Sequence, residues 1–570
     1  MGEKMRLETN HPKPWRRITA CVIFIFIFWT LLSYSSDGLQ SFIKRIFNIT
    51  TPAPSTGTDD GSLSSHGPAP TGNSFVSGFD MKQSWGHLSP YKDADWGVPK
   101  GVPREGKCEL SQVHVLHRHA QRYATNMPLD GGNIQNFLAK INESSGTTGP
   151  LEFINSWEYV VGLDELMRTG AATEDTSGAN FWLQYGRLLY RATPENVVAW
   201  DPALNIYPNG TARPKPVFRT TSQSRIYESA RWWLSGFFGN RDAHGSHEQY
   251  DLVVLPEQLY FNNTLASYYA CPGAPGSQSG GDDKAREFIP RYLAEARSRL
   301  SPYFPSGFNL TTLDVLAMQT ICVYEFTSLA GSKYCSLFTE QEWEGFAYSL
   351  DLQYYGNFGF PSPVGRAQGI GYVLELAARL KQELITSSDT SINFTYDDNI
   401  AQFPLGQPFY MDMSHDDIIV SVMAALNLEY FKHPSATGMS GDVDSPFDRT
   451  FKISNITPFG ARFVSEIWTC PNGVDFDDLD PVLYTNPNLE STEDTTKYIR
   501  FVLNGAPLPM TGVLGCKGAT NGFCPLDNFL GGIPELKEKA NYQEACYGHW
   551  LNDSQVDGVS DIPVEAFLSK

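Results

Sequence analysis

The stretch "HRHAQRYAT" at residues 117–125 decides how the fold of this chain is interpreted, because it directly follows the apolar, strand-like run "QVHVL" at 112–116. Ligands of an open α/β sheet bind just beyond the carboxyl ends of its strands. Arg118 and Arg122 carry rigid forks of N–H donors that suit a phosphate or a carboxylate. His119 lies between them and is a candidate nucleophile. The stretch therefore predicts an anion site at the end of a strand.

Two other interpretations of this stretch stay open from the residues alone. The arginines could form a solvated basic turn beside one core histidine. Alternatively, His114, His117 and His119, which lie close together in the sequence, could hold a metal, and His117 and His119 would point the same way on a strand. The two arginines would repel a cation, and no carboxylate or cysteine lies nearby in the sequence to complete such a site. We therefore expect no metal.

Two further junctions repeat the order of strand, loop and helix. In "FRTTSQSRIYESARWW" (218–233), Arg219 stands at the end of a short β-like run. In "YMDMSHDDIIVSVMAAL" (410–426), Ser414 is a plausible N-cap, and His415 and Asp416 lie at a helix start, where unpaired N–H groups favour an anion. Three such junctions carrying Arg, His and Asp indicate one site.

Composition limits the partners of the chain. Its 570 residues are 41% hydrophobic, which is enough for a large core, and the formal net charge is −20. Nucleic acids and anionic membrane surfaces need a broad basic face. The charge therefore argues against nucleic acid and anionic membrane surfaces as partners.

Hydrophobic spacing predicts an α/β fold. We expect a three-layer α/β/α domain with a mainly parallel sheet, plus a smaller, mostly helical inserted domain at about 130–350. The periodicity predicts short buried strands at 112–117 and 409–413, and helices at 225–238, 367–384 and 416–428.

The N-terminal part differs in composition from the rest. A basic tail (1–17) precedes the uncharged apolar run 18–34, whose length is at the short end of what spans a bilayer. Because no good small-residue cleavage site follows, we expect an uncleaved transmembrane signal-anchor, with a cleaved signal peptide as the alternative. Residues 35–100 predict a stalk rich in Pro, Ser, Thr and Gly. We expect the folded region to comprise residues 101–570.

Cysteines and sequons predict export to the luminal or extracellular side. Apart from Cys21 the chain has eight cysteines, an even number as four disulfides require. We expect a single-pass membrane protein of the cell surface with its folded region outside, or a secreted protein if the N-terminal segment is cleaved. Candidate N-glycosylation sites are Asn48, Asn142, Asn209, Asn262, Asn309, Asn393, Asn455 and Asn552.

Taken together, these segments resemble the histidine acid phosphatases, and within them the secreted fungal phytases and acid phosphatases. The first family motif, R-H-G-x-R-x-P, is matched by "RHAQRYA" at 118–124, and the His-Asp pair by "SHDDI" at 414–418. The resemblance covers roughly residues 105–550. Further similar segments are "RTTSQSR" (219–225), "YCSLFTEQEWEGFAYSLDLQYYG" (334–356), "GRAQGIGYVLELAARL" (365–380) and "GCKGATNGFC" (515–524).

The resemblance implies a role for each site residue. His119 would attack phosphorus and become phosphohistidine, and Asp416 would protonate the leaving alkoxide. No metal or other cofactor is implied. The phosphoryl oxygens would be held by Arg118, Arg122, Arg219 and His415. The implied disulfides are Cys108–Cys470, Cys271–Cys546, Cys322–Cys335 and Cys516–Cys524.

Two departures from the family pattern fall inside the first motif. Ala120 replaces glycine, which would strain a backbone with positive φ, and Ala124 replaces proline. Leu352 and Gln353 stand where phytases commonly carry lysines. We therefore expect hydrolysis of phosphomonoesters, including phytate, at acidic pH. The alternatives are a dedicated phytase, or a catalytically impaired surface glycoprotein that only binds phosphate.

Overall fold

A computed structural model describes residues 79–104, 108–194, 200–239, 246–274, 279–434, 439, 449–489 and 494–548. The predicted tail, the apolar run 18–34, and the sequons at Asn48 and Asn552 lie outside these residues. Among the described helices, none combines the length and apolarity needed to cross a membrane.

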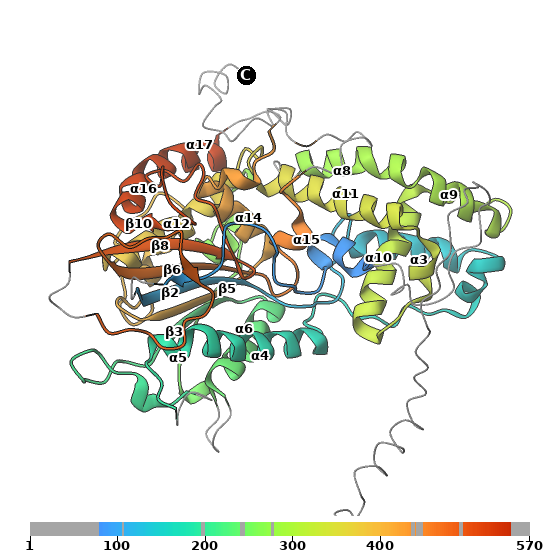
Figure 1. Cartoon of the computed structure of the whole chain (residues 1–570). Helices are drawn as coiled ribbons and strands as arrows, with labels where there is room; N and C mark the ends of the chain where they lie inside the picture. The colour runs from blue at the N-terminus through green and yellow to red at the C-terminus, as the bar shows by residue number, and fades with distance from the viewer. Residues whose placement is uncertain are drawn as a thin grey trace, which may run out of the picture. The chain divides into compact units, whose positions relative to one another are not determined.

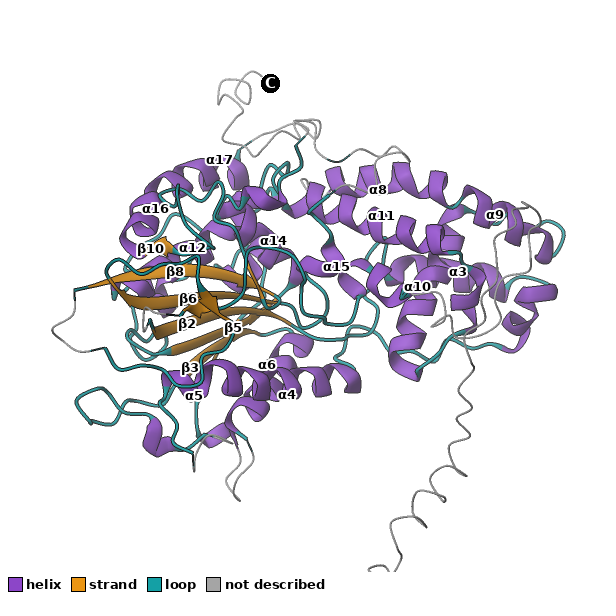
Figure 2. Ribbon diagram, viewed as in Figure 1, coloured by secondary structure: helices purple, strands orange, loops and turns teal. Residues whose placement is uncertain are grey.

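The centre of the fold is one sheet with the strand order β10-β8-β6-β2-β5-β3-β4, in which β9 also pairs with β8 (Figure 2). A separate pair, β1–β7, lies outside it. The strands are β1 Val102–Pro103, β2 Glu109–Arg118, β3 Val217–Thr221, β4 Asp251–Leu255, β5 Phe409–Ser414, β6 Arg462–Pro471, β7 Leu479–Asp480, β8 Thr495–Leu503, β9 Ala506–Pro507 and β10 Cys524–Pro525.

The sheet is mixed. Strands β2, β5, β3 and β4 are parallel to one another, whereas β6, β8, β9 and β10 pair antiparallel. Strands β3 and β5 are buried along their whole length, as parallel strands covered on both faces must be. Among the described residues between β6 and β8 there is no crossover helix, which suits the antiparallel pairing of the two strands. The chain thus has the predicted α/β class, and its parallel pairs are confined to one half of the sheet.

Helices cover both faces of the sheet (Figure 1). On one face α6 contacts β3 and β5 and packs against α4, and Trp233 of α6 stacks on Phe409 of β5 with ring centroids 5.9 Å apart. On the other face α14 contacts β2, α16 contacts β8, and α12 packs against both helices. These helices are α4 Arg168–Phe181, α6 Ser224–Phe238, α12 Gly365–Lys381, α14 Asp416–Ala425 and α16 Leu526–Ala540, with the shorter α5 Arg187–Leu189, α13 Phe394–Asp397 and α17 Tyr542–Tyr547 nearby in the chain.

The helical part lies at one end of the sheet and is built from two separate stretches (Figure 1). It contains α3 Gly131–Asn142, α8 Ser279–Tyr292, α9 Ala294–Leu300, α10 Thr312–Leu329 and α11 Glu340–Phe358, beside the short α15 Ile453–Ile456. Between α3 and α8 the chain returns to the sheet for α4, β3, α6 and β4. The range 130–350 is therefore not one continuous insertion, because β3 and β4 fall inside it.

Residues 79–100 correct the predicted stalk. This segment is part of the folded region: Trp85 and Leu88 are buried, and the Trp85 ring lies 5.6 Å from that of Phe326 on α10. The physical reason is composition, because "FDMKQSWGHLSPYKDADWGVPK" supplies large apolar side chains that residues 51–74 almost entirely lack.

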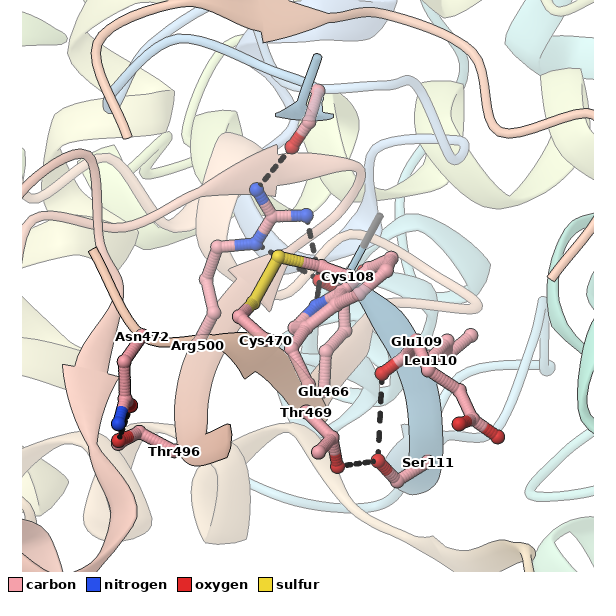
Figure 3. The surroundings of a disulfide bond; sticks show 12 residues. Cys108, Glu109, Leu110, Ser111, Glu466, Thr469, Cys470, Asn472, Thr496 and Arg500 are labelled. Carbon is pink, nitrogen blue, oxygen red and sulfur yellow. Dashed lines mark hydrogen bonds and ion pairs between the residues drawn. A yellow bond between two sulfur atoms is a disulfide. The ribbon is translucent and has the colours of Figure 1, made fainter. Parts of the chain in front are cut away.

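Four disulfides join the same pairs that the resemblance implies: Cys108–Cys470, Cys271–Cys546, Cys322–Cys335 and Cys516–Cys524. The first ties the segment before β2 to the end of β6, next to the buried Glu466–Arg500 ion pair at 2.7 Å (Figure 3). Such covalent ties suit an oxidising compartment.

A buried ion cluster lies between the sheet and α12. Arg219 of β3 contacts Asp412 of β5 at 2.7 Å, Glu375 of α12 at 2.6 Å and Asp397 of α13 at 3.5 Å, and Arg379 contacts Asp412 at 2.7 Å. Two guanidiniums thus face three carboxyl groups. Burial and the neighbouring Glu375 raise the pKa of Asp397 from 3.8 to about 9, so this group stays protonated and the cluster is electrically balanced.

This cluster predicts that the stability of the fold decreases with rising pH. Between the ordinary carboxyl pKa and about 9, folded Asp397 holds a proton that the unfolded chain has released. The contribution of this proton to the free energy of unfolding is therefore complete below pH ~4 and decreases until pH ~9. Its size is about 1.4 kcal/mol for each unit by which folding raises the pKa of Asp397. Asp397→Asn should remove this part of the dependence, measured as the urea midpoint against pH.

The exposed neighbour Asp398 provides the control, since Asp398→Asn should leave the pH dependence as it is. An equally steep pH dependence in the Asp397→Asn variant would show that the carboxyl group is ionised in the folded chain.

Candidate active site

The register of the parallel strands brings two of the predicted junctions to one edge of the sheet. Arg118 ends β2 and is paired with Ser414, which ends β5. His119 and His415 follow directly, and their ring centroids are 6.0 Å apart. His415 is the N-cap residue of α14, whereas the Ser414 hydroxyl donates to the Leu265 carbonyl, so the predicted N-cap shifts by one residue.

His119 is arranged as a neutral imidazole. Burial lowers its pKa well below the ordinary value, and the charges of Arg118 and Arg225 lower it further. Its Nδ1 lies 2.8 Å from the Ala120 carbonyl oxygen, which can only accept, so Nδ1 carries the proton. The lone pair is then on Nε2, which has no hydrogen-bond partner among the described residues. A neutral ring with an available nitrogen is what a nucleophile requires.

Arg118 and Asp416 form an ion pair within the site. The Arg118 Nη2 lies 2.7 Å from Asp416 Oδ2, while Nη1 donates to the carbonyl oxygens of His87 and Thr457. Asp416 Oδ2 also accepts a hydrogen bond of 2.8 Å from the Tyr354 hydroxyl. Burial alone would raise the pKa of Asp416, but the charge of Arg118 and nearby groups holds it far below its usual range. Asp416 is thus ionised before any ligand binds.

Arg122 is fixed by the loop that follows β2. Its Nη1 donates to Asp130 at 3.2 Å and to the Tyr324 hydroxyl at 2.9 Å. The loop pairs with the segment before α4 through the bridges Arg122–Leu166 and Ala124–Leu163, and these bridges supply stiffness where the family has proline.

Ala120 causes no backbone strain. It is buried, and it is not among the non-glycine residues with positive φ in the described part of the chain. The Cβ that distinguishes it from glycine is therefore accommodated.

His415 is a further positive group of the site. Its Nε2 lies 2.7 Å from Glu257 and 3.1 Å from the Tyr268 hydroxyl. Burial alone would lower the pKa of His415, but the Glu257 carboxylate raises it above the ordinary value. His415 is therefore cationic at acidic pH.

The structure corrects the assignment of Arg219. This residue pairs with Asp412, which is level with Leu116, so it lies two residues before the edge of the sheet, about 7 Å from the level of Arg118. Its guanidinium is held in the buried ion cluster and faces carboxylates, not the histidines.

Arg225 occupies the place predicted for Arg219. It lies in the first turn of α6, beyond the end of β3, and its charge lowers the pKa of His119. Its Nη1 is 3.8 Å from the exposed carboxylate of Asp164, and its Nε, which is buried, has no hydrogen-bond partner. The signal in the sequence was the second arginine of "RTTSQSR".

The remaining histidines of the opening stretch have structural surroundings. His117 donates from Nδ1 to the Arg118 carbonyl, and its Nε2 lies 3.0 Å from the Ser177 hydroxyl. His114 stacks on Tyr410 with ring centroids 4.5 Å apart. Burial lowers the pKa of both, so both are neutral core histidines.

Each cation of the site has its own carboxylate. The four pairs are Arg118–Asp416, Arg122–Asp130, Arg225–Asp164 and His415–Glu257. The sequence did not identify three of these carboxylates, nor Tyr354 and His87. The carboxylates and His87 come from segments without a recognisable motif, whereas Tyr354 lies in the family-like segment 334–356 but has no role assigned there. His87 lies in the segment predicted as stalk, and its ring packs on Tyr354 at 4.7 Å. The arrangement can receive one tetrahedral dianion in front of His119.

Comparison with known proteins agrees with this geometry. Phytase A of Emericella nidulans is 27% identical and covers 82% of this chain and 91% of its own length. The thiamine-repressible acid phosphatase of Schizosaccharomyces pombe is 26% identical and covers 84% and 94%. Among solved structures, the phytase of D. castellii matches with a TM-score of 0.62 and 20% identity, over 83% of this chain and 88% of that one, which confirms the fold.

A family model, the histidine phosphatase superfamily (branch 2), matches residues 109–504. This range begins with β2, ends at the close of β8, and contains both motifs of the site. The chain therefore belongs to the histidine phosphatase superfamily, branch 2.

Proposed function

We propose that this protein hydrolyses phosphomonoesters, phytate among them, at acidic pH, with His119 as the nucleophile. The observation that carries the proposal is the neutral His119, whose Nδ1 donates to the Ala120 carbonyl while four cations surround the ring. The names of two relatives, a phytase and an acid phosphatase, support the same reaction class.

The reaction follows from these positions. His119 Nε2 attacks phosphorus, the bond from phosphorus to the ester oxygen breaks, and the leaving alkoxide takes a proton from Asp416. Water then attacks the phosphohistidine, gives a proton to Asp416 and releases phosphate. Arg118, Arg122, Arg225 and His415 hold the phosphoryl oxygens through both steps.

Asp416 can act as an acid only after it gains a proton. In the ligand-free site, Arg118 keeps it ionised. When phosphoryl oxygens bind Arg118, their negative charge offsets the guanidinium and lies beside the carboxylate, which raises the pKa of Asp416. Acidic solution supplies the proton. The substrate therefore converts Asp416 into the general acid.

Export of the folded region is part of the proposal. The four disulfides support an oxidising compartment. Asn142, Asn209 and Asn309 are exposed and accessible to glycosylation, whereas the Asn262 side-chain amide donates to the Ile392 carbonyl.

We place the basic tail in the cytosol and the apolar run 18–34 in the membrane, and carbonate extraction of membranes that carry the full chain tests this anchor.

The nucleophile is tested by trapping the phosphoenzyme. A phosphohistidine holds its phosphoryl group through an N–P bond, which acid cleaves and alkali does not. A quench in mid-turnover should therefore trap a phosphoryl label on the protein that is acid-labile and alkali-stable. His119→Ala should lose the label and at least about 10³-fold in kcat. The exposed His247 serves as the control residue, and His247→Ala should keep both. Substantial turnover by His119→Ala would refute the assignment.

Arg225 is distinguished from Arg219 by kinetics. Arg225→Gln should lower kcat/KM by about 10²-fold, the cost of removing one donor to a developing charge, with little change in the thermal midpoint. Arg219→Gln should mainly lower the midpoint, because it leaves buried carboxylates unpaired. Arg231→Gln, on the exposed side of the same helix, should change neither quantity. An unchanged kcat/KM in the Arg225→Gln variant would show that a group other than Arg225 holds the phosphoryl oxygens.

A further inference from the structure

Two loops that border the site carry exposed apolar side chains. On the segment that precedes α4, Val160 is 67% exposed and Leu163 is 47% exposed. On the loop after β4, Leu259 is 60% exposed and Tyr260 is 71% exposed. We name these four side chains the rim surface. Exposed apolar groups that gather at a polar site mark the binding of an apolar ligand part, whereas scattered ones need no explanation.

The first loop is tied directly to the catalytic loop. Leu163 forms a β-bridge with Ala124, two residues beyond Arg122, and the Asp164 N–H donates to the Ala124 carbonyl at 2.9 Å. The Asp164 carboxylate then pairs with Arg225. The backbone of Leu163 therefore lies beside the loop that carries Arg122 and next to the carboxylate partner of Arg225.

The second loop is tied to His415. Glu257, two residues before Leu259, contacts the His415 ring at 2.7 Å. The Tyr260 N–H donates to the Tyr269 carbonyl, and the neighbouring Tyr268 hydroxyl lies 3.1 Å from His415. Tyr260 itself has φ of 63°, a left-handed backbone that is rare for a bulky side chain. The loop thus holds a tyrosine outward at a conformational cost.

The start of α6 lies between the two loops. The Ser224 hydroxyl donates to Glu165 of the first loop at 2.6 Å, and the Ser222 hydroxyl accepts from the Glu257 N–H of the second at 2.9 Å. Arg225 follows in the same turn. The two loops that carry the rim surface therefore both contact the turn that holds Arg225, one of the proposed phosphate-holding guanidiniums.

The charges of these segments disfavour a second phosphate on the substrate. Residues 119–135, 156–167, 222–225 and 256–269 contain no lysine. The four cations already have carboxylate partners, and Glu165 adds a further negative charge on the first loop. A second phosphate would find no unpaired cation in these segments and would meet carboxylates instead.

We propose that the rim surface binds the alcohol part of the substrate, and that the preferred substrates carry a single phosphate on an apolar alcohol, an alkyl chain or an aryl ring. This inference rests on the proposed function. Contacts remote from phosphorus that persist in the transition state raise kcat/KM. The aliphatic and aromatic side chains of the rim surface supply such contacts, and the paired cations supply the place for one phosphoryl group.

The test is kcat/KM for linear alkyl phosphates from ethyl to decyl, each below its micelle concentration. Full burial of a methylene is worth about fourfold, so partial burial on an open rim should give about twofold for each methylene. The ratio of decyl to ethyl phosphate should therefore exceed about 10²-fold, and phytate should fall below decyl phosphate. The double variant Leu259→Ser with Tyr260→Ser should lower this ratio by about tenfold or more.

A matched control uses an equally exposed apolar pair away from the site. Val482 is 47% exposed and Tyr484 is 78% exposed, on the loop between β7 and β8. Val482→Ser with Tyr484→Ser should keep the wild-type ratio. A ratio near one in the wild type, or an equal loss in both double variants, would overturn the proposal.

Failure of the proposed function has a different outcome. If no ester releases phosphate, the proposed reaction class is wrong. Equilibrium binding of the esters then tests whether the rim surface binds their alcohol part. Calorimetry should still give tighter binding of decyl than of ethyl phosphate, with the difference reduced in the Leu259→Ser, Tyr260→Ser variant. Equal affinities for the two esters would contradict the rim surface independently of turnover.

Discussion

The active site depends on the pairing of four cations with four carboxylates at one edge of the sheet. Buried cations without counter-charges would destabilise the fold, and each pair meets this requirement before any ligand binds. The pairs differ in strength, because Arg118–Asp416 and His415–Glu257 are short and buried whereas Arg225–Asp164 reaches the surface. A binding phosphoryl group must compete with these carboxylates. In the proposed mechanism, protonation of Asp416 removes one competitor and at the same time creates the acid.

The same requirement explains why one arginine of "RTTSQSR" belongs to the buried ion cluster and the other to the proposed site. Arg219 lies two residues before the end of its strand, where the sheet and α12 surround it with Asp412, Glu375 and Asp397. Arg225 lies beyond the end of the strand, where its charge acts on His119. Confusing the two is easy from sequence, because Thr220 and Thr221 fit a buried strand as well as a polar turn. Only the register of the strands separates them.

The sequence predicted what depends on local pattern. Strands β2 and β5, helices α6, α12 and α14, and the positions of His119 and His415 follow from apolar runs and helical spacing around a recognisable motif. Partners that arrive through tertiary packing did not follow. Glu257 comes from a segment without a motif, and Tyr354 lies in the family-like segment 334–356 but has no role assigned there. His87 comes from the segment predicted as stalk. The start of the folded region was misplaced with this segment.

The central claim is that anion binding at Arg118 forces a proton onto Asp416. Sulfate tests it directly, since it resembles phosphate in shape and remains a dianion at pH ~5. Calorimetric titration in two buffers of different ionisation enthalpy measures the protons taken up for each sulfate bound. We predict uptake of about one proton by the wild-type protein and close to none by Asp416→Asn, in which the site cannot be protonated at this position. Binding without proton uptake in the wild type, or equal uptake in both proteins, would contradict the account.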